Sequence, residues 1–206
     1  MKRFVLLTLS LLAFILPISA KNDPKAGEVL DKVSSSIAKS NGIEAGYTLL
    51  SNQGNASGTI LLKGQKFRMD GGGITTWFDG KTQWTYIKAN EEVNVSVPTK
   101  QELQNINPYA FLYMYKKGFA YKMGPTTKVG KQKVYEIILN STGKSAQVQI
   151  TLLVDQATYQ PLQIKMIEGN IHSVININSF KKKKLADSTF AFKKSYAPKA
   201  EIIDLR

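Results

Sequence analysis

The chain has 206 residues, a formal net charge of +13, a single histidine and no cysteine. A chain without cysteine cannot form disulfide bonds, thiolate zinc sites or a lipid-modified cysteine that would tether it to a membrane. The strong positive charge favours anionic partners, either a phospholipid surface or nucleic acid.

The first 20 residues have the parts of a secretory signal peptide. Two basic residues precede an uncharged apolar run at 4–17, and small residues precede the expected cleavage point after Ala20. The run is shorter than the roughly 20 residues of a membrane-spanning helix. We therefore expect residues 1–20 to be removed and residues 21–206 to form one domain, free in the periplasm of a Gram-negative bacterium. Export makes nucleic acid the weaker candidate partner.

The first expected element of the mature chain is a helix at residues 24–39. Asp23 suits the N-cap, a proline follows it, and apolar residues recur at the spacing of one helix face. From residue 43 to residue 97 the apolar period changes to two, which indicates strands separated by turns. Asp79 and Gly80 lie between two aromatic arms and predict a tight hairpin, because glycine accepts the positive φ that such turns require.

Two helical segments and a second series of strands are expected after the hairpin. Thr99 and Glu102 have the spacing of a capping box, and the apolar segment 109–118 ends in lysines and a glycine, as helices often do. Further strands are expected at 133–139, 146–154, 162–168, 171–180 and 188–192. Short turns between about ten consecutive strands favour a curled antiparallel sheet. The expected fold is α+β: a strongly curved antiparallel sheet forming an incomplete β-barrel, or half-barrel, closed by short helices acting as a lid.

The sequence offers few groups for catalysis. His172 lies in a strand pattern, where a lone histidine is usually structural, and the acidic residues are scattered without a pairing suited to acid–base chemistry. The glycines at 71–73 are not followed by a helix with a phosphate-binding lysine. We therefore expect a binding function, with no enzymatic activity, no cofactor and no metal ion.

Large apolar side chains around the hairpin allow two interpretations. They either form an ordinary core or line an apolar cavity on the concave face of the curved sheet. The residues concerned are Phe67, Met69, Trp77, Trp84 and Tyr86. A basic run later in the chain is likewise either a solvated strand end or a docking patch for anionic lipid headgroups or a partner complex. That run consists of Lys181, Lys182, Lys183 and Lys184.

The predicted hairpin resembles that of the LolA-like periplasmic carriers of outer-membrane lipoproteins. The resemblance rests on FDGKTQWTY at 78–86 and NEEVNV at 90–95. Segments in the family's order and at similar distances are LDKVSS at 30–35, GTILLKGQKFRMD at 58–70, Asn107-Pro108 and the terminal T-F-x-F at 189–192. The resemblance implies a half-barrel chaperone that carries lipoproteins without chemistry. It would accept them from an inner-membrane ABC-type release complex and deliver them to an outer-membrane acceptor.

The resemblance also implies a cavity for acyl chains. By matching position, the cavity residues are Leu30, Phe67, Met69, Trp84, Tyr86, Tyr109 and Leu112, to which we add Trp77 from its place in the hairpin. The chain departs from the family at 63–65, where Lys-Gly-Gln replaces an arginine before a proline that helps to hold the lid closed. A carrier of another acylated molecule, and a lipid-binding periplasmic sensor or scaffold on the same half-barrel, remain alternatives. We expect a monomer.

Overall fold

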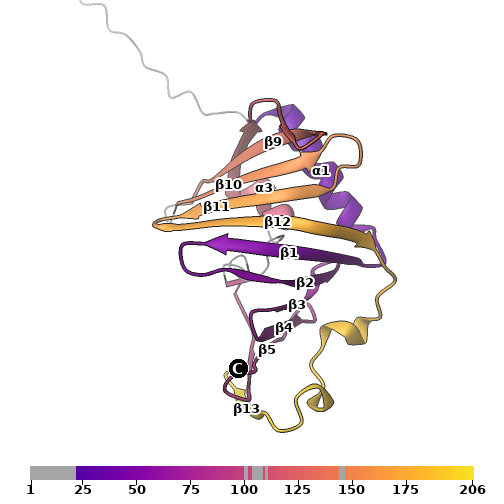
Figure 1. The fold of residues 1–206 in the computed structure, drawn as a ribbon, viewed down its shortest axis with the longest axis vertical. Helices are drawn as coiled ribbons and strands as arrows, with labels where there is room; N and C mark the ends of the chain where they lie inside the picture. Colours follow the sequence, from indigo (N-terminus) through magenta and orange to yellow (C-terminus); the bar gives the residue numbers. More distant parts are fainter. Residues whose placement is uncertain (1–21, 100–101, 104–108, 110, 144–146) are drawn as a thin grey trace, which may run out of the picture.

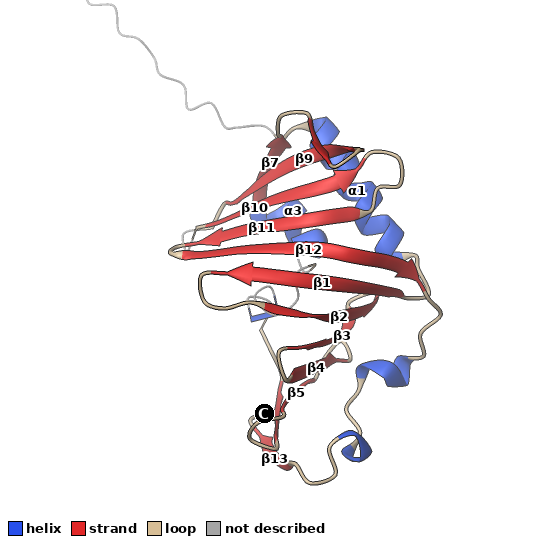
Figure 2. Ribbon diagram, in the orientation of Figure 1, coloured by secondary structure: helices blue, strands red, loops and turns tan. Residues whose placement is uncertain are grey.

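The protein is built on one large, curved β-sheet that carries helices on one face (Figures 1 and 2). The computed structural model describes residues 22–99, 102–103, 109, 111–143 and 147–206. The predicted signal peptide therefore lies outside the described residues. Within them, every helix falls short of the length and apolar character that a membrane span requires.

The elements follow one another in a long series of strands. In chain order they are α1 (Pro24–Ala38), β1 (Ile43–Ser51), β2 (Ala56–Lys63), β3 (Lys66–Gly71), β4 (Ile74–Phe78), β5 (Gln83–Ile87), β6 (Glu92–Ser96), α3 (Phe111–Gly118), β7 (Phe119–Met123), β8 (Thr127–Val129), β9 (Gln132–Ser141), β10 (Val148–Asp155), β11 (Pro161–Glu168), β12 (Ile171–Lys182), the 3-10 turns η1 (Asp187–Phe190) and η2 (Lys194–Tyr196), and β13 (Glu201–Asp204). Neighbouring strands lie in the order β13-β6-β5-β4-β3-β2-β1-β12-β11-β10-β9-β7, and β8 pairs with β9.

The sheet is open and mixed. Its two ends are β13 and β7, so it does not close into a barrel. Every pairing is antiparallel except that of β13 with β6, which is parallel. The prediction of a purely antiparallel sheet was wrong at this point, because residues 183–200 run from the end of β12 to the far edge and approach β6 from its start. The α+β class and the strong curvature are confirmed; a lid role for the helices stays a prediction.

Local signals define the first helix closely. The Asp23 carboxylate accepts hydrogen bonds from the backbone N–H groups of Lys25 (2.8 Å) and Ala26 (3.2 Å), as an N-cap does. Its other oxygen accepts from the backbone N–H of Met123 in β7 at 3.2 Å. These backbone bonds, with that of Met123 largest, lower the pKa of Asp23. The cap therefore both begins α1 and fastens it to the sheet.

Two other predicted elements have different outcomes. The capping box is present, since the Glu102 carboxylate accepts from the backbone N–H of Thr99 at 2.7 Å and the Thr99 hydroxyl accepts in return at 3.3 Å. Most of the helix predicted to follow lies outside the described residues. The strand predicted at 188–192 was wrong, because this segment leaves the sheet and forms η1 and an extended stretch without a strand partner.

Candidate functional site

The inner face of the sheet, defined here as the face that α1 and α3 cover, holds the main apolar cluster. Five predicted cavity residues lie together in this cluster. Four belong to α1, β3 and α3, and one precedes α3 in the chain. They are Leu30 of α1, Phe67 and Met69 of β3, Tyr109, and Leu112 of α3. All are buried except Met69, which is half-buried. The structure thus brings together residues that lie 82 positions apart in the chain, the separation of Leu30 and Leu112.

Phe78 and Tyr115 also belong to this cluster, although the sequence analysis missed them. The Phe78 ring lies 5.5 Å from that of Phe67, its cross-strand partner. Phe78 could have been found from the alternation of strand β4, because it must face opposite to its neighbour Trp77. Tyr115 had a helical signal, since it follows Leu112 by one turn.

The other three predicted cavity residues lie on the opposite, outer face. Trp77 pairs directly with Trp84 across β4 and β5, and Trp84 and Tyr86 pair in turn with Val95 and Val93 of β6. Side chains directly opposite each other in a sheet point to the same face. These aromatic residues are therefore separated from the inner-face cluster by the sheet itself.

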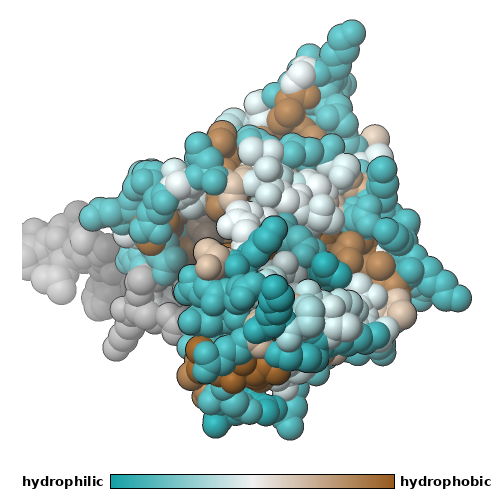
Figure 3. Space-filling model, turned by 60° about the horizontal axis from the view of Figure 1, so that its bottom comes forward, coloured by the Kyte–Doolittle hydropathy of each residue, from teal (hydrophilic) through white to brown (hydrophobic). Residues whose placement is uncertain are grey.

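The chain's own C-terminal end covers this outer aromatic surface. We name residues 183–206 the C-terminal strap. Trp77 is only 2% exposed; its ring stacks on Tyr196 with centroids 5.9 Å apart and meets Phe192 edge-on at 5.5 Å. Trp84 packs against a small second cluster that includes Ala197 and Ala200 of the strap. Viewed from the end that carries β13 and the strap, apolar surface occurs as separate patches among hydrophilic atoms (Figure 3).

Polar contacts fix the strap at its beginning and at its end. The Lys63 ammonium donates to the backbone oxygen of Leu185 at 2.9 Å and to the Asp187 carboxylate at 2.8 Å. Lys66 pairs with the same carboxylate at 3.2 Å, and the two lysines, Lys63 first, lower the pKa of Asp187. At the far end, the backbone N–H of Leu205 donates to the Val95 oxygen at 2.8 Å. Lys63 begins the Lys-Gly-Gln segment that stands where the family resemblance suggests an arginine before a proline, and here it holds the strap.

A polar contact on the other side of the molecule joins the two helices. The Asp31 carboxylate of α1 accepts from the Tyr115 hydroxyl at 2.6 Å and pairs with the Lys116 ammonium at 2.7 Å. These bonds, that of Lys116 first, lower the pKa of Asp31. Burial and the bond to Asp31 raise the pKa of Tyr115. We call these three residues the α1–α3 contact, because it attaches the helix that carries Leu112 to the helix that carries Leu30.

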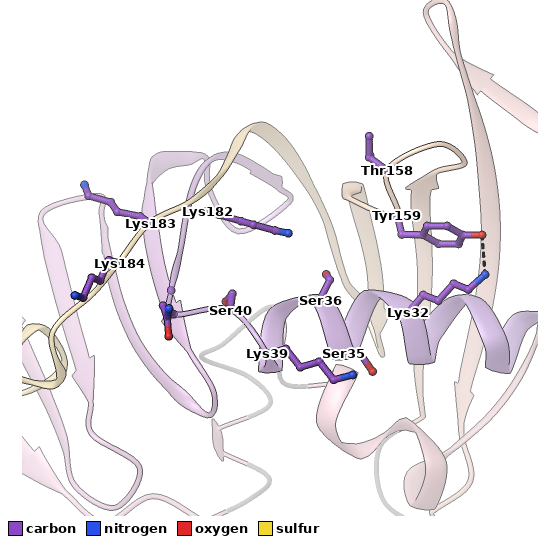
Figure 4. A pocket seen from close by; sticks show the side chains of 12 residues that line it. Lys32, Ser35, Ser36, Lys39, Ser40, Thr158, Tyr159, Lys182, Lys183 and Lys184 are labelled. Carbon is purple, nitrogen blue, oxygen red and sulfur yellow. Dashed lines mark hydrogen bonds between the residues drawn. The ribbon is translucent and has the colours of Figure 1, made fainter.

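The predicted basic run lies at the end of β12. Lys182, Lys183 and Lys184 line a hollow of 710 Å³ beside the C-terminal end of α1, whereas Lys181 is not part of its lining (Figure 4). His172 is exposed at the start of β12. In the described part of the chain, histidine, aspartate and glutamate side chains nowhere gather in a group of three that could hold a metal ion.

A match to a known family of proteins shows to which family this chain belongs. A profile of the family described as "Outer membrane lipoprotein carrier protein LolA" matches residues 16–170. The chain belongs to the LolA-like family. In this LolA-like protein the match includes α1, Phe67 and Met69 of β3, the hairpin of β4 and β5, and α3. It ends before β12 and the C-terminal strap.

Several solved structures are similar to this LolA-like chain at low identity. MucB has 9% identity and a TM-score of 0.48 over 83% of this chain and 64% of that chain, so this chain spans less than two thirds of MucB. A putative outer membrane lipoprotein-sorting protein domain from Vibrio parahaemolyticus has 11% identity and a TM-score of 0.46, covering 80% and 97% of the two chains. A LolA superfamily protein from Nitrosomonas europaea has 12% identity and a TM-score of 0.41, covering 81% and 97%. No curated protein matches the chain.

Proposed function

We propose that this LolA-like protein is a periplasmic carrier that shields the acyl chains of lipoproteins between the inner and outer membranes. The observation that carries the proposal is the inner-face cluster, an apolar layer between a curved sheet and two helices in a chain that matches the carrier family. The proposal takes residues 21–206 as one carrier domain, exported after removal of residues 1–20 and acting as a monomer. The proposal includes loading by an ABC-type complex and delivery to an outer-membrane acceptor. It includes no chemical reaction.

The cargo must compete with the protein's own side chains. Leu30, Phe67, Tyr109 and Leu112 are each no more than 1% exposed, so they occupy the space that acyl chains would need. A buried methylene contributes about 0.8 kcal/mol, and one long acyl chain therefore gains on the order of 10 kcal/mol before ordering costs. A shuttle cannot retain all of that free energy and still release its cargo. When the cargo leaves, Tyr109 and Leu112 return to the cluster, and their burial offsets part of the free energy that is lost with the acyl chain.

In this mechanism α3 is the element that moves. It is eight residues long and continues directly into β7. Its contact with α1 depends on the exposed ion pair of Asp31 with Lys116 and on the buried Tyr115, whereas α1 is fastened to β7 by its N-cap Asp23. Moving α3 would open the side of the cluster that holds Leu112 and leave the sheet and α1 in place. The outer aromatic residues Trp77, Trp84 and Tyr86 keep their cover throughout, so they stabilise the fold and do not touch the cargo.

Mass spectrometry of the protein purified gently from periplasm tests the carrier proposal directly. We expect an acylated lipoprotein to co-purify in near-stoichiometric amount and to dissociate on organic extraction. A different acylated molecule in that amount would replace lipoprotein as the cargo. An empty, homogeneous protein that also fails to take up added triacylated lipopeptide would overturn carriage and favour a sensor or scaffold.

Cross-linking α3 to α1 tests the opening mechanism. Because the chain has no cysteine, Asp31→Cys with Lys116→Cys creates the only two thiols, which a reducible bifunctional thiol reagent can join. We expect the cross-linked protein to lose lipopeptide uptake and to regain it on reduction. The control pair Lys25→Cys and Glu28→Cys lies within α1 and should keep uptake after cross-linking. Undiminished uptake by the cross-linked α1–α3 pair would show that α3 does not need to move.

A further inference from the structure

The hollow beside the end of α1 has a strongly basic lining. It lies between the last turns of α1, the loop before β11 and the end of β12, on the side of α1 that faces away from the inner-face cluster (Figure 4). Every charged residue of its lining is a lysine: Lys32, Lys39, Lys182, Lys183 and Lys184. Hydroxyl groups of serine, threonine and tyrosine make up most of the remaining polar lining.

Two of these lysines already have partners. The Lys32 ammonium pairs with Glu28 at 2.7 Å and donates to the Tyr159 hydroxyl at 3.0 Å. Lys183 pairs with Glu44. Among the described residues, Lys39, Lys182 and Lys184 make no ion pair and leave three positive charges uncompensated around the hollow. Lys182 points across it towards α1, whereas Lys184 points outward at its rim (Figure 4).

The backbone around the hollow is held firmly in place. The N–H of Lys183 donates to the Gly42 oxygen at 2.9 Å, and the N–H of Leu185 donates to the Asn41 oxygen at 3.1 Å. Gly42 has φ +148°, and a Cβ there would lie 2.5 Å from the Lys183 oxygen, so only glycine allows the strand end to approach α1 this closely. The backbone that carries the free lysines is therefore fixed on both sides of the hollow.

We propose that this hollow binds the phosphate of an anionic phospholipid headgroup at a membrane surface. Lys182 reaches across the hollow, and Lys39 and Lys184 add uncompensated positive charge to its lining, which suits a phosphate diester because lysine is a common phosphate ligand. The Ser36 and Ser40 hydroxyls donate to backbone oxygens at 2.9 and 2.7 Å, which leaves the lysines as the main donors to a ligand. The site goes beyond carriage, because phospholipid binding needs no lipoprotein. It would bring the polar side of α1 to the membrane while the apolar side stays in the inner-face cluster.

Vesicle cosedimentation with matched variants tests this site. The test variant is Lys39→Ser, Lys182→Ser and Lys184→Ser; the control is Lys128→Ser, Lys131→Ser and Lys133→Ser, three exposed lysines of the β8–β9 hairpin with the same total charge. Each lysine near an anionic surface contributes roughly fivefold in affinity. For vesicles of phosphatidylglycerol and phosphatidylcholine we expect a loss on the order of 100-fold in the test variant and less than fivefold in the control.

Three results would overturn the headgroup site. The first is an equal loss in both variants, which would mean that total charge alone attracts the protein. The second is wild-type vesicle binding by the test variant. The third is binding of free glycerol phosphate by the wild type without binding to vesicles, which would assign the hollow to a soluble phosphate. None of these results affects lipopeptide uptake, so the carrier proposal is judged separately.

Discussion

Trp77 stabilises the molecule by filling a space between two rings of the C-terminal strap. Both the Tyr196 ring, 8° from parallel, and the Phe192 ring contact it, and the Arg68 guanidinium lies 5.4 Å from its centre. Removing a buried tryptophan leaves a large void that its surroundings cannot collapse into fully. At the scale of single residues, the packing of the strap against the sheet therefore depends strongly on the Trp77 side chain.

We expect Trp77→Ala to lower the free energy of unfolding by about 3–5 kcal/mol. Trp84→Ala should cost less, because Trp84 is only half-buried in the same surface. Urea denaturation followed by circular dichroism measures both values. Equal losses, or a smaller loss for Trp77→Ala, would contradict the packing described for the strap.

Asp187 makes the attachment of the strap depend on pH. Lys63 and Lys66 lower the pKa of its carboxyl below the ordinary value of 3.8, so the attachment is fully present above that value and is lost as the pH falls through the lowered pKa. We expect hydrogen exchange at the Leu185 amide to accelerate below pH 3.8 relative to the intrinsic rate. Asp187→Asn should show faster exchange at neutral pH and no such acid step. An unchanged acid step in Asp187→Asn would assign it to another group.

At the scale of elements, the α1–α3 contact controls how readily α3 leaves the inner-face cluster. Exposed ion pairs contribute about 0.2–1 kcal/mol, and this one is reinforced by the Tyr115 hydroxyl. We expect Asp31→Asn to speed lipopeptide uptake about two- to fivefold, the increase that such a loss predicts if α3 must open. Stopped-flow fluorescence with a labelled lipopeptide measures the rate.

Glu28→Gln is the matched control for Asp31→Asn. It makes the same charge change on the same helix, but Glu28 pairs with Lys25 and Lys32 of α1 itself and has no contact with α3 among the described residues. Uptake by Glu28→Gln should stay at the wild-type rate. Equal acceleration in the two variants would mean that the rate responds to charge and not to α3.

The elements that the sequence predicted well are those whose causes are local. Helix α1 ends within one residue of its predicted bounds, because its cap and apolar period lie within the segment itself. The hairpin of β4 and β5 was predicted from its turn, yet Trp77, Trp84 and Tyr86 were assigned to the cavity face, whereas the structure places them on the outer face, where the distant strap covers Trp77. The strand predicted at 188–192 had strand-like composition but no neighbour to pair with. The predicted cavity residues likewise came from both faces of the sheet, because the segments that cover each face are distant in the sequence.

At the scale of the whole molecule, the sheet has two halves that meet at β1 and β12. Strands β1 to β6 form one antiparallel series and β7 to β12 form the other, and the pairing of β1 with β12 joins them from Ile43↔Lys182 to Ser51↔Ser173. Without the other half, β1 or β12 would be an edge strand with unpaired backbone groups. The strap then returns from the second half and adds β13 to the outer edge of the first.

We expect a chain ending at residue 170 to lose cooperative folding, although it contains the whole family match. Without β12, strand β1 has no partner on one side and β11 none on the other, and neither the strap nor β13 is present. Thermal unfolding followed by circular dichroism should show a broad change in place of a single transition. A sharp transition at the full-length temperature would mean that the two halves fold independently.

The β1–β12 pairing also sets when folding can finish. Ser51 and Ser173, hydrogen-bonded across this pair, are 122 residues apart in the chain, and closing so long a loop is slow compared with forming a local hairpin. During synthesis the first half emerges well before the strand that completes its edge. The chain therefore stays without its central pair until nearly all of it has been made. An arrangement in which the last long strand completes the sheet delays the end of folding, which would suit the export that we propose for the chain.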